Sequence, residues 1–394
     1  MKHLFKHLTF LIIIVLFTGC NQFQQKEINE LISGIRQKYV PDRRIALFDV
    51  HVDKAGQLAV EGETNVVAAF NELDSILKTD YPKVACKVIC LPSESLGEKT
   101  WGIITISVAN LRSIPGHSAE LVTQALLGTP VKVLKKDNNW YLVQTPDSYL
   151  GWTTGGSISM MTEDEIRQFN NSERIIFTGM TGSCYQLPDE YSQPVSDLIL
   201  GSILEVDEIH TRFFRVKFPD GRTGFVDKKQ CLPLDIWKES FTYSPEKILK
   251  TAMPFLGLPY LWGGTSSKAV DCSGFTKTVF FMNGIILQRD ASQQVLYGDL
   301  VNTSEDYGNL KPADLLFFGT HETDSTKERV THVAIYIGNG EIIHSSGLVR
   351  KNSMIPGKEN YSSYLDSIFI RAKRILTCVG ESGIEPFFEN DFYK

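Results

Sequence analysis

The sequence predicts an α+β protein with four folded parts: a small N-terminal α+β unit, two small β-barrels and a C-terminal α+β domain. Three observations predict this. Apolar residues recur at helical spacing near the N-terminus, two strand-dense stretches resemble each other, and helix and strand signals alternate from residue 241 onward. With 394 residues, 42% hydrophobic and 22% charged, the chain is long enough for several cores. The net charge of −6 comes from interspersed charges of both signs, so we expect no nucleic-acid partner.

The first 19 residues form a segment of their own. Lys2 and Lys6 precede an apolar run over residues 8–17, and Thr18-Gly19-Cys20 follows. This is the pattern of a secretory signal, and the run is too short to span a bilayer; a buried N-terminal helix is the alternative. The ending, residues 16–20, resembles a bacterial lipobox. That resemblance implies cleavage before Cys20, a lipid on its thiol, and an exported, membrane-anchored lipoprotein in the periplasm or cell envelope.

Residues 20–100 are expected to form the N-terminal α+β unit. Apolar residues over 28–35 have helical spacing, strands over 45–52 and 58–60 flank a turn at 53–56, and residues 66–77 give a second amphipathic helix. We identify no candidate chemistry in this unit.

Two strand-dense stretches, residues 101–160 and 172–236, predict the two barrels. Leu127-Gly128 and the residues after it parallel Leu200-Gly201 and its successors, and each stretch closes on a glycine followed by an aromatic residue. Such a repeat indicates two copies of one fold, with a polar helix over 163–171 between them. The segment 109–115 with these features resembles the bacterial SH3-like domain, which often binds cell-wall material.

Cysteine spacing gives no dense disulfide framework. Cys86 and Cys90 lack a matching second pair, so zinc is weakly supported there. A bridge between Cys184 and Cys231 is conceivable in an exported protein, and the sequence leaves it open.

The C-terminal domain, residues 241–394, contains a cysteine at the start of a helix. The residues after Cys272 are helical in length, and Asn283-Gly284 ends them. At a helix start, unpaired N–H groups and the positive end of the dipole favour thiolate over thiol. Cys272 is therefore a candidate nucleophile, although a small buried cysteine is the more ordinary role for such a residue.

Two histidines flank a predicted hairpin turn at Asn339-Gly340. His332 begins a buried strand and His344 lies on the returning strand, so the two rings can be neighbours. His321 falls in a polar loop and is the least probable participant. A Cys/His/His zinc site is a rival, but no fourth ligand has suitable spacing, so we expect no metal.

Four motifs in order resemble the NlpC family of papain-like cell-wall peptidases. They are Tyr260-x-Trp262-Gly263-Gly264, Asp271-Cys272-Ser273-Gly274-Phe275, Asp314-Leu315-Leu316-Phe317-Phe318 and His332-Val333-Ala334-Ile335-Tyr336-Ile337-Gly338. The likeness covers about residues 241–374. Two preceding SH3-like domains are typical of one subgroup, the γ-D-glutamyl-L-diamino acid endopeptidases, also called dipeptidyl-peptidase VI. The resemblance implies a papain-like catalytic domain with no cofactor.

The family's catalytic roles transfer to three positions. The resemblance implies that Cys272 is the nucleophile, His332 the general base, and His344 the third residue, which holds the tautomer of His332. A neutral histidine in the third place should stabilise the imidazolium less than a carboxylate would.

The resemblance also implies a set of substrate contacts. Glu120 and Tyr149 of the first barrel, with Asp271, fit the positions that hold the substrate's amine, and two carboxylates with a phenol suit an ammonium. Further matching positions are Ser273, Ser292 and Trp262 for substrate binding, and Tyr260 as a candidate for stabilising the oxyanion.

The function implied is hydrolysis of the γ-D-Glu–L-diamino acid bond in peptidoglycan-derived peptides that carry a free N-terminal L-alanine. Cleavage would proceed through a thioester and serve peptidoglycan turnover or recycling. Two alternatives stay open: a non-catalytic wall-binding lipoprotein, and an amidase or acyltransferase on the same scaffold. The sequence does not identify the diamino acid or the oligomeric state.

Overall fold

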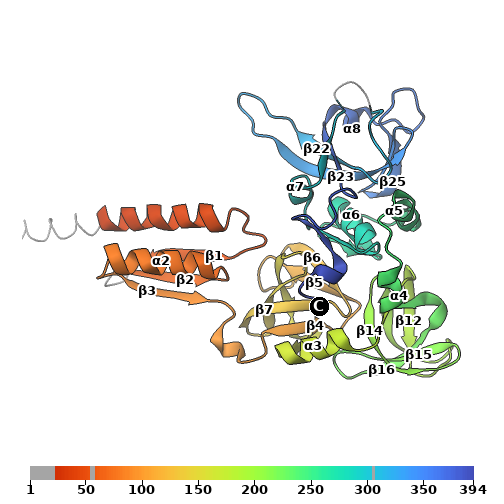
Figure 1. Cartoon of the computed structure of the whole chain (residues 1–394), viewed down its shortest axis with the longest axis horizontal. Helices are drawn as coiled ribbons and strands as arrows, with labels where there is room; N and C mark the ends of the chain where they lie inside the picture. Colours follow the sequence, from red (N-terminus) through yellow and green to blue (C-terminus); the bar gives the residue numbers. More distant parts are fainter. Residues whose placement is uncertain (1–22, 54–57, 304–306) are drawn as a thin grey trace, which may run out of the picture. The chain divides into compact units, whose positions relative to one another are not determined.

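The computed structural model describes residues 23–53, 58–303 and 307–394 (Figure 1). The chain divides into two compact units, residues 1–97 and 98–394. The signal-like segment, Cys20 and most of the turn expected at 53–56 lie outside the described residues. Within the described ranges, no helix combines the length and the apolar character needed to cross a bilayer.

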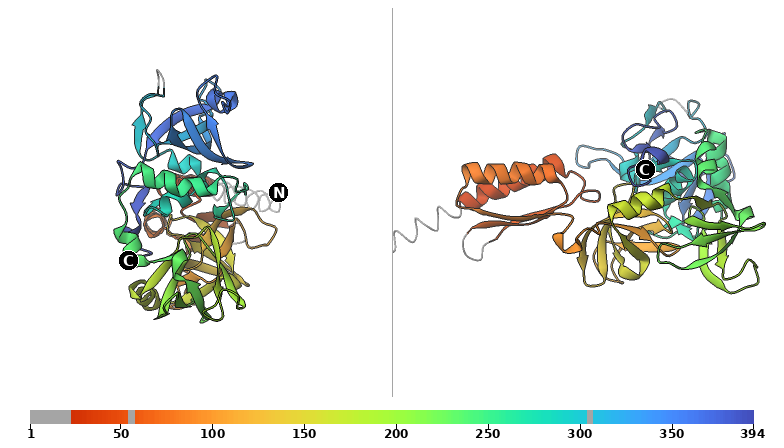
Figure 2. Two further views of the ribbon diagram at one scale, coloured as in Figure 1. Left: turned by 90° about the vertical axis from the view of Figure 1, so that its right-hand side faces the viewer. Right: turned by 60° about the horizontal axis from the view of Figure 1, so that its bottom comes forward.

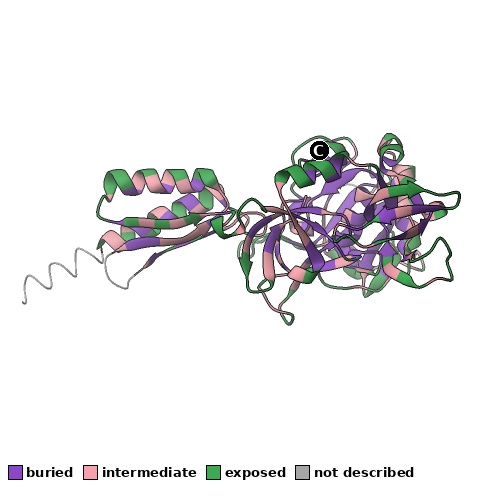
Figure 3. Ribbon diagram, turned by 90° about the horizontal axis from the view of Figure 1, so that it is seen from below, coloured by how far each residue is buried: buried purple, intermediate pink, exposed green. Residues whose placement is uncertain are grey.

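The N-terminal unit is a three-stranded sheet with helices on one face (Figure 2). Apolar residues of the helix over 23–39 and of α2 recur every three or four positions and pack on the strands, which buries one side of each helix (Figure 3). The predicted hairpin is present, and a third strand, parallel to the second, was not predicted. The elements after the first helix are β1 (Phe48–Asp53), β2 (Ala59–Thr64), α2 (Val67–Asp80) and β3 (Ala85–Cys90).

The first barrel is a seven-stranded antiparallel sheet in the order β10-β4-β7-β8-β9-β5-β6. Buried apolar residues alternate with exposed ones along β5, as expected where one face of a strand covers a core. Its strands are β4 (Trp101–Ile104), β5 (Val108–Arg112), β6 (Leu121–Leu126), β7 (Pro130–Asp137), β8 (Trp140–Gln144), β9 (Leu150–Thr154) and β10 (Ile158–Met161).

The second barrel repeats this plan in the order β13-β12-β16-β15-β14-β11-β17. Cys184 and Cys231 lie in its core as free thiols, so the conceivable disulfide is not formed. Burial raises the pKa of each to about 12. The strands are β11 (Arg174–Phe177), β12 (Thr181–Tyr185), β13 (Pro194–Ile199), β14 (Ile203–Ile209), β15 (Phe213–Lys217), β16 (Thr223–Asp227) and β17 (Cys231–Pro233).

The repeated segments of the two barrels contact each other. The Ile203 N–H donates to the Leu127 carbonyl at 2.9 Å. Gly128, at φ 80°, lies so close that a Cβ there would be 2.0 Å from the Ile203 oxygen. Only glycine fits, both for its backbone angle and for the space. The helix between the barrels, α3 (Glu163–Asn171), begins with a capping box formed by Thr162 and Glu165.

The C-terminal domain is a six-stranded antiparallel sheet in the order β21-β26-β22-β23-β24-β25, with α6 packed against it (Figure 1). Helix α4 (Leu234–Glu239) precedes this domain and packs on β11 and β17 of the second barrel. The helices of the C-terminal domain are α5 (Pro245–Ala252), α6 (Cys272–Phe281), α7 (Ala291–Gln294) and α8 (Ser363–Ser367). Its strands are β18 (Thr265–Ser266), β19 (Ala269–Val270), β20 (Ile285–Leu287), β21 (Asp299–Val301), β22 (Leu315–Thr320), β23 (Arg329–Gly338), β24 (Glu341–Ser346), β25 (Leu348–Ser353), β26 (Phe369–Arg374) and β27 (Ile384–Pro386).

Helix α6 is buried along most of its length. Phe275 and Val279 are fully buried and share a core with Val333 and Ile335 of β23. The Phe275 ring also meets Phe255 edge-on at 5.5 Å between centroids. This packing fixes the helix, and with it the position of Cys272 relative to the sheet.

The last residues of the chain join the barrels to the C-terminal domain. β27 pairs with β20, and Phe387 and Tyr393 enter a core shared with Ile103 of the first barrel. The Asn390 side chain donates to the Pro146 carbonyl at 3.0 Å. These contacts help hold the first barrel beside α6.

Candidate active site

Cys272 is the first residue of α6, as the sequence predicts. Asp271 caps the helix by accepting from the Gly274 N–H at 2.7 Å. Cys272 is 7% exposed and lies in one core with Val333 of β23, whose backbone N–H also acts to lower the pKa of the Cys272 thiol. Val333 follows His332 in β23, so this packing brings Cys272 to the strand that carries the predicted base.

His332 and His344 lie on neighbouring strands on either side of the predicted hairpin turn. Asn339 and Gly340 both have positive φ, 54° and 75°, as a tight two-residue turn requires. His332 Nε2 lies 2.8 Å from His344 Nδ1. The bond occupies Nε2 of His332, so Nδ1 is the nitrogen left for a reaction with the Cys272 sulfur.

A third polar residue extends this pair of hydrogen-bonded histidines. His344 Nε2 lies 2.9 Å from Asn352 Oδ1 of β25. Both ring nitrogens of His344 are therefore engaged by protein, which leaves neither to bind a metal in this arrangement. The Cys/His/His zinc alternative thus lacks a free donor at His344.

Burial sets the protonation of the thiol and the ring. It raises the pKa of the Cys272 thiol to about 12, and the charge of Asp271 adds to this, while hydrogen bonds from the Val333 and Ser273 backbone and the Arg289 charge act in the opposite direction. Burial also lowers the pKa of His332 to about 3, assisted by His344 and Arg350. The helix start therefore does not by itself ionise the thiol, because burial outweighs it.

A proton transfer from Cys272 Sγ to His332 creates two opposite charges together. Two unit charges that are about 4 Å apart attract each other by about 4 kcal/mol at an effective dielectric constant near 20. That attraction offsets much of the desolvation that disfavours each charge alone. The site thus favours a neutral thiol–imidazole pair at rest and an ion pair during reaction.

Asp271 is held by a buried arginine that sequence analysis missed. Arg289 is 1% exposed, and its Nη1 donates to Asp271 Oδ1 at 3.1 Å while its Nη2 donates to Oδ2 at 2.5 Å. Asp271 also accepts from the Gly263 N–H at 2.9 Å. With the Gly274 N–H and the Ser273 hydroxyl, five donors surround this carboxylate, which leaves little capacity for a further cation.

The same arginine ties the first barrel to the nucleophile. Its Nε donates to Thr123 Oγ1 of β6 at 3.0 Å, and its Nη1 donates to Ser273 Oγ at 3.1 Å. Ser273 is buried, so its hydroxyl serves this network. Arg289 therefore couples the position of the barrel to the residues on both sides of Cys272.

Glu120 and Tyr149 of the first barrel each form a hydrogen bond with a residue of the C-terminal domain, but the two partners differ. Glu120, which is exposed, accepts from Trp262 Nε1 at 2.8 Å. The buried Tyr149 donates to Asp290 Oδ2 at 3.0 Å. The structure thus brings both barrel residues to the peptidase domain and adds Asp290, which the sequence analysis did not select.

Tyr260 and Ser292 complete the predicted set. Burial raises the pKa of Tyr260 to about 12, with the charges of Cys272 and Asp271 contributing, so its phenol stays protonated at neutral pH. Ser292 is half-buried in α7. A protonated phenol near the nucleophile has the chemistry of an oxyanion donor.

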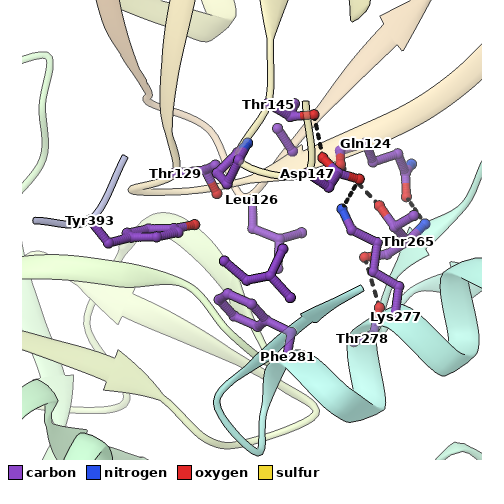
Figure 4. A pocket seen from close by; sticks show the side chains of 13 residues that line it. Gln124, Leu126, Thr129, Thr145, Asp147, Thr265, Lys277, Thr278, Phe281 and Tyr393 are labelled. Carbon is purple, nitrogen blue, oxygen red and sulfur yellow. Dashed lines mark hydrogen bonds and ion pairs between the residues drawn. The ribbon is translucent and has the colours of Figure 1, made fainter. Parts of the chain in front are cut away.

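A separate cavity of about 60 Å³ is lined by residues of the first barrel and of α6, among them Thr145, Lys277 and Phe281 (Figure 4). Lys277 of α6 forms an ion pair with the buried Asp147 at 2.6 Å, and Asp147 accepts from Thr145 at 2.5 Å. Neither Cys272 nor His332 lines it. The cavity belongs to the contact between barrel and helix, not to the reacting groups.

The site residues that the sequence did not predict differ in how strong a sequence signal they carry. Arg289 and Asp290 directly precede the segment selected for Ser292, so an adjacent Arg–Asp pair was an available signal. Asn352 follows Arg350 and Lys351 in what reads as an ordinary surface strand. Only the pairing of β24 with β25 brings it to His344.

A buried cysteine at the start of a helix, packed against an antiparallel sheet that carries two hydrogen-bonded histidines, is the arrangement of a papain-like cysteine peptidase domain. Residues 257–371 match the NlpC/P60 family, and residues 107–159 match the bacterial SH3 domain. The chain belongs to the NlpC/P60 family. This confirms the family and fold class expected from the motifs.

Three relatives illustrate the likeness. The chain is 32% identical over 272 residues to a gamma-D-glutamyl-L-lysine dipeptidyl-peptidase of Bacillus cereus, covering 67% of this chain and 75% of that protein. It is 28% identical to dipeptidyl-peptidase 6 of Lysinibacillus sphaericus, covering 62% and 87%. A crystal structure of an NlpC/P60 family protein from Bacillus cereus matches with a TM-score of 0.57 at 26% identity, covering 70% of this chain and 99% of that one.

Proposed function

We propose that this NlpC/P60 peptidase hydrolyses the γ-D-Glu–L-diamino acid bond of peptidoglycan-derived peptides that begin with a free L-alanine. The names of its relatives support this substrate, since they are called γ-D-glutamyl-L-lysine dipeptidyl-peptidase and dipeptidyl-peptidase 6. The observation that carries the proposal is the position of Cys272, which begins α6 and shares a core with Val333, the residue after His332. The proposed reaction uses protein side chains and water, and it requires no cofactor.

Cys272 and His332 carry the acylation step. His332 Nδ1 takes the Sγ proton as the sulfur attacks the γ-carbonyl carbon of D-glutamate, which forms a C–S bond and a tetrahedral oxyanion. The Tyr260 phenol donates to that oxygen. As the C–N bond breaks, the proton on His332 passes to the departing amine of the diamino acid, and a thioester remains.

Water completes the cycle. His332 takes a proton from a water molecule, which attacks the thioester carbonyl, and the C–S bond breaks. The proton returns to the sulfur, and L-Ala-γ-D-Glu leaves with a free carboxylate. His344 holds the His332 ring in place throughout. Ser292 is proposed to contact the polar groups of the substrate directly, whereas Ser273, whose hydroxyl is bonded to Asp271 and Arg289, is proposed to support the site from behind.

Glu120 is the proposed anchor of the substrate ammonium. It is exposed, its side chain is a carboxyl group, and it accepts a hydrogen bond from Trp262. Tyr149 supplies a phenol oxygen nearby on the same barrel. Asp271 is surrounded by five donors, so its proposed contribution is mainly its field and its support of the α6 start rather than a direct bond to the amine.

A digest of synthetic tripeptides tests the proposal. Wild-type protein and Cys272→Ala are incubated with L-Ala-γ-D-Glu-diaminopimelate and L-Ala-γ-D-Glu-L-Lys, and products are identified by mass spectrometry. We expect L-Ala-γ-D-Glu and free diamino acid from wild type only. Equal cleavage of an N-acetylated tripeptide would contradict the role of the free amine. Transfer of the acyl group to an added amine would indicate an acyltransferase, and absence of any product would indicate a wall-binding protein.

We also propose that the protein is exported and anchored by a lipid on Cys20. Support comes from the lipobox-like residues 16–20 and from a family whose members act on the cell wall. Metabolic labelling with an alkyne fatty acid in a bacterial host should mark the wild-type chain and not Cys20→Ser. Labelling of both to the same extent would contradict the anchor.

A further inference from the structure

Asn352 takes part in a row of hydrogen bonds that ends at His332. Its Nδ2 donates to the Asn360 carbonyl at 3.0 Å, and its Oδ1 lies 2.9 Å from His344 Nε2. The Asn360 carbonyl also accepts from the Ser353 N–H at 2.8 Å, which holds that oxygen in position. The next bond joins His344 Nδ1 to His332 Nε2 at 2.8 Å.

The direction of each bond follows from the one before it. A carbonyl oxygen only accepts, so the Asn352 amide must present its NH₂ to Asn360 and its oxygen to His344. That oxygen also only accepts, so His344 Nε2 must carry a proton. In a neutral ring Nδ1 of His344 is then a lone pair, and His332 Nε2 must be the donor.

This assignment leaves the lone pair of His332 on Nδ1, the nitrogen available to Cys272. We infer that Asn352 is a positioning residue, which selects the Nε2–H tautomer of His344 and through it the basic tautomer of His332. The inference rests on the proposed peptidase function for its kinetic consequence, but the tautomers themselves are a property of the resting protein.

Protonation of His344 would reverse the last bond. With protons on both nitrogens, His344 would donate from Nδ1, and His332 would have to accept at Nε2. The neutral His332 ring would then carry its proton on Nδ1, where it cannot act as a base. Activity should therefore fall at low pH when His344 becomes an imidazolium.

Several charged groups influence that protonation. Burial lowers the pKa of His344 and Arg350, which pairs with it across β24 and β25, lowers it further, while the bond to Asn352 raises it. His332 faces it from β23. Glu341, on the same strand as His344, accepts from the Asn360 side chain at 3.2 Å.

Two substitutions at Asn352 have opposite expected effects on the acid limb of the pH–rate profile. Asn352→Asp places a carboxylate on His344 Nε2, which stabilises the imidazolium, so activity should be lost at a higher pH than in wild type. Asn352→Leu removes the acceptor that raises the pKa of His344, so the acid limb should move to lower pH. If Asn352 had only a structural role, the two substitutions would not move the acid limb in opposite directions.

Asn352→Leu should also lower kcat. Without the acceptor the two tautomers of His344 mix, and we expect kcat to fall by about tenfold to a hundredfold while KM changes by less than about twofold. Lys351→Leu, on the same strand, is the matched control and should leave both parameters and the pH profile unchanged.

Nitrogen-15 NMR of histidine-labelled protein tests the inference without a substrate. Two-bond ¹H–¹⁵N spectra distinguish the tautomers, and His344→Gln and His332→Gln spectra assign the signals. At neutral pH we expect both rings to be neutral with the proton on Nε2, and His344 in Asn352→Leu to become a mixture. A proton on His344 Nδ1 in wild type, or an unchanged His344 signal in Asn352→Leu, would overturn the inference. An inactive protein with the expected tautomers would instead count against the proposed function alone.

Discussion

Replacing Arg289 with methionine should destabilise the protein more than any exposed ion pair would. Arg289 makes four hydrogen bonds: two to Asp271, one to Ser273 and one to Thr123. Methionine fills much of the same volume but carries neither charge nor donors. The change therefore leaves the buried Asp271 carboxylate without its counter-charge.

The expected size follows from that lost counter-charge. Removing one partner of a buried ion pair typically costs about 3–5 kcal/mol, because the remaining charge is desolvated and unpaired. Thr123→Val removes one bond to the same guanidinium and should cost about 1–2 kcal/mol. In the double variant Arg289→Met/Asp271→Asn, a neutral amide replaces the carboxylate. The cost of losing Arg289 should therefore be smaller by about 2 kcal/mol or more than it is when Asp271 is present.

Urea unfolding of the whole chain, followed by tryptophan fluorescence, measures these differences in free energy. The double-mutant cycle isolates the Arg289–Asp271 interaction from the loss of packing. A cost below about 1 kcal/mol for Arg289→Met, or strict additivity of the two substitutions, would refute the view that this ion pair organises the start of α6. Arg289→Met should also raise the pKa of Cys272 further, since the Arg289 charge lowers it.

Two further predictions concern pH and substrate binding. Because burial lowers the pKa of His332 to about 3, the unfolded chain binds more protons than the folded chain between that value and its ordinary pKa. Stability should therefore fall as pH falls, and His332 alone should contribute a loss of about 2 kcal/mol between pH 7 and pH 5. Urea midpoints of wild type and His332→Gln at the two pH values check this; an equal pH dependence in both would contradict it. Glu120→Gln should raise KM for the free-amine tripeptide by about tenfold to a hundredfold with little change in kcat, because it removes the proposed ammonium partner and keeps a side chain that can accept from Trp262. Steady-state kinetics decide this, and an unchanged KM would exclude Glu120 as the anchor.

Local sequence signals predicted the elements that carry the candidate catalytic residues. The helix after Cys272 begins at that residue, and the turn at Asn339-Gly340 adopts the positive φ values that its residue types favour. The helix expected over 163–171 is α3, which begins with a capping box. In each case the deciding residues lie within one or two turns of chain, so short-range preferences are sufficient.

Local sequence signals could not predict the residues whose role depends on tertiary contacts. Arg289 reads as an ordinary charged residue until β6 and α6 are brought around it. Asn352 depends on the register between β24 and β25, and the C-terminal residues Phe387 and Tyr393 depend on a core shared with the barrels. Strand β3 was also missed, since its alternation includes Lys87 and exposed Ile89 and resembles a surface segment.

The central claim is that the Cys272 sulfur becomes acylated by the γ-carbonyl of D-glutamate. Rapid acid quenching during turnover of L-Ala-γ-D-Glu-diaminopimelate, followed by peptide mass spectrometry, measures this directly. We expect an L-Ala-γ-D-Glu adduct on the peptide that contains Cys272, absent from His332→Gln and from Cys272→Ala. Full hydrolytic activity in Cys272→Ala, or an adduct on any other residue, would contradict the account.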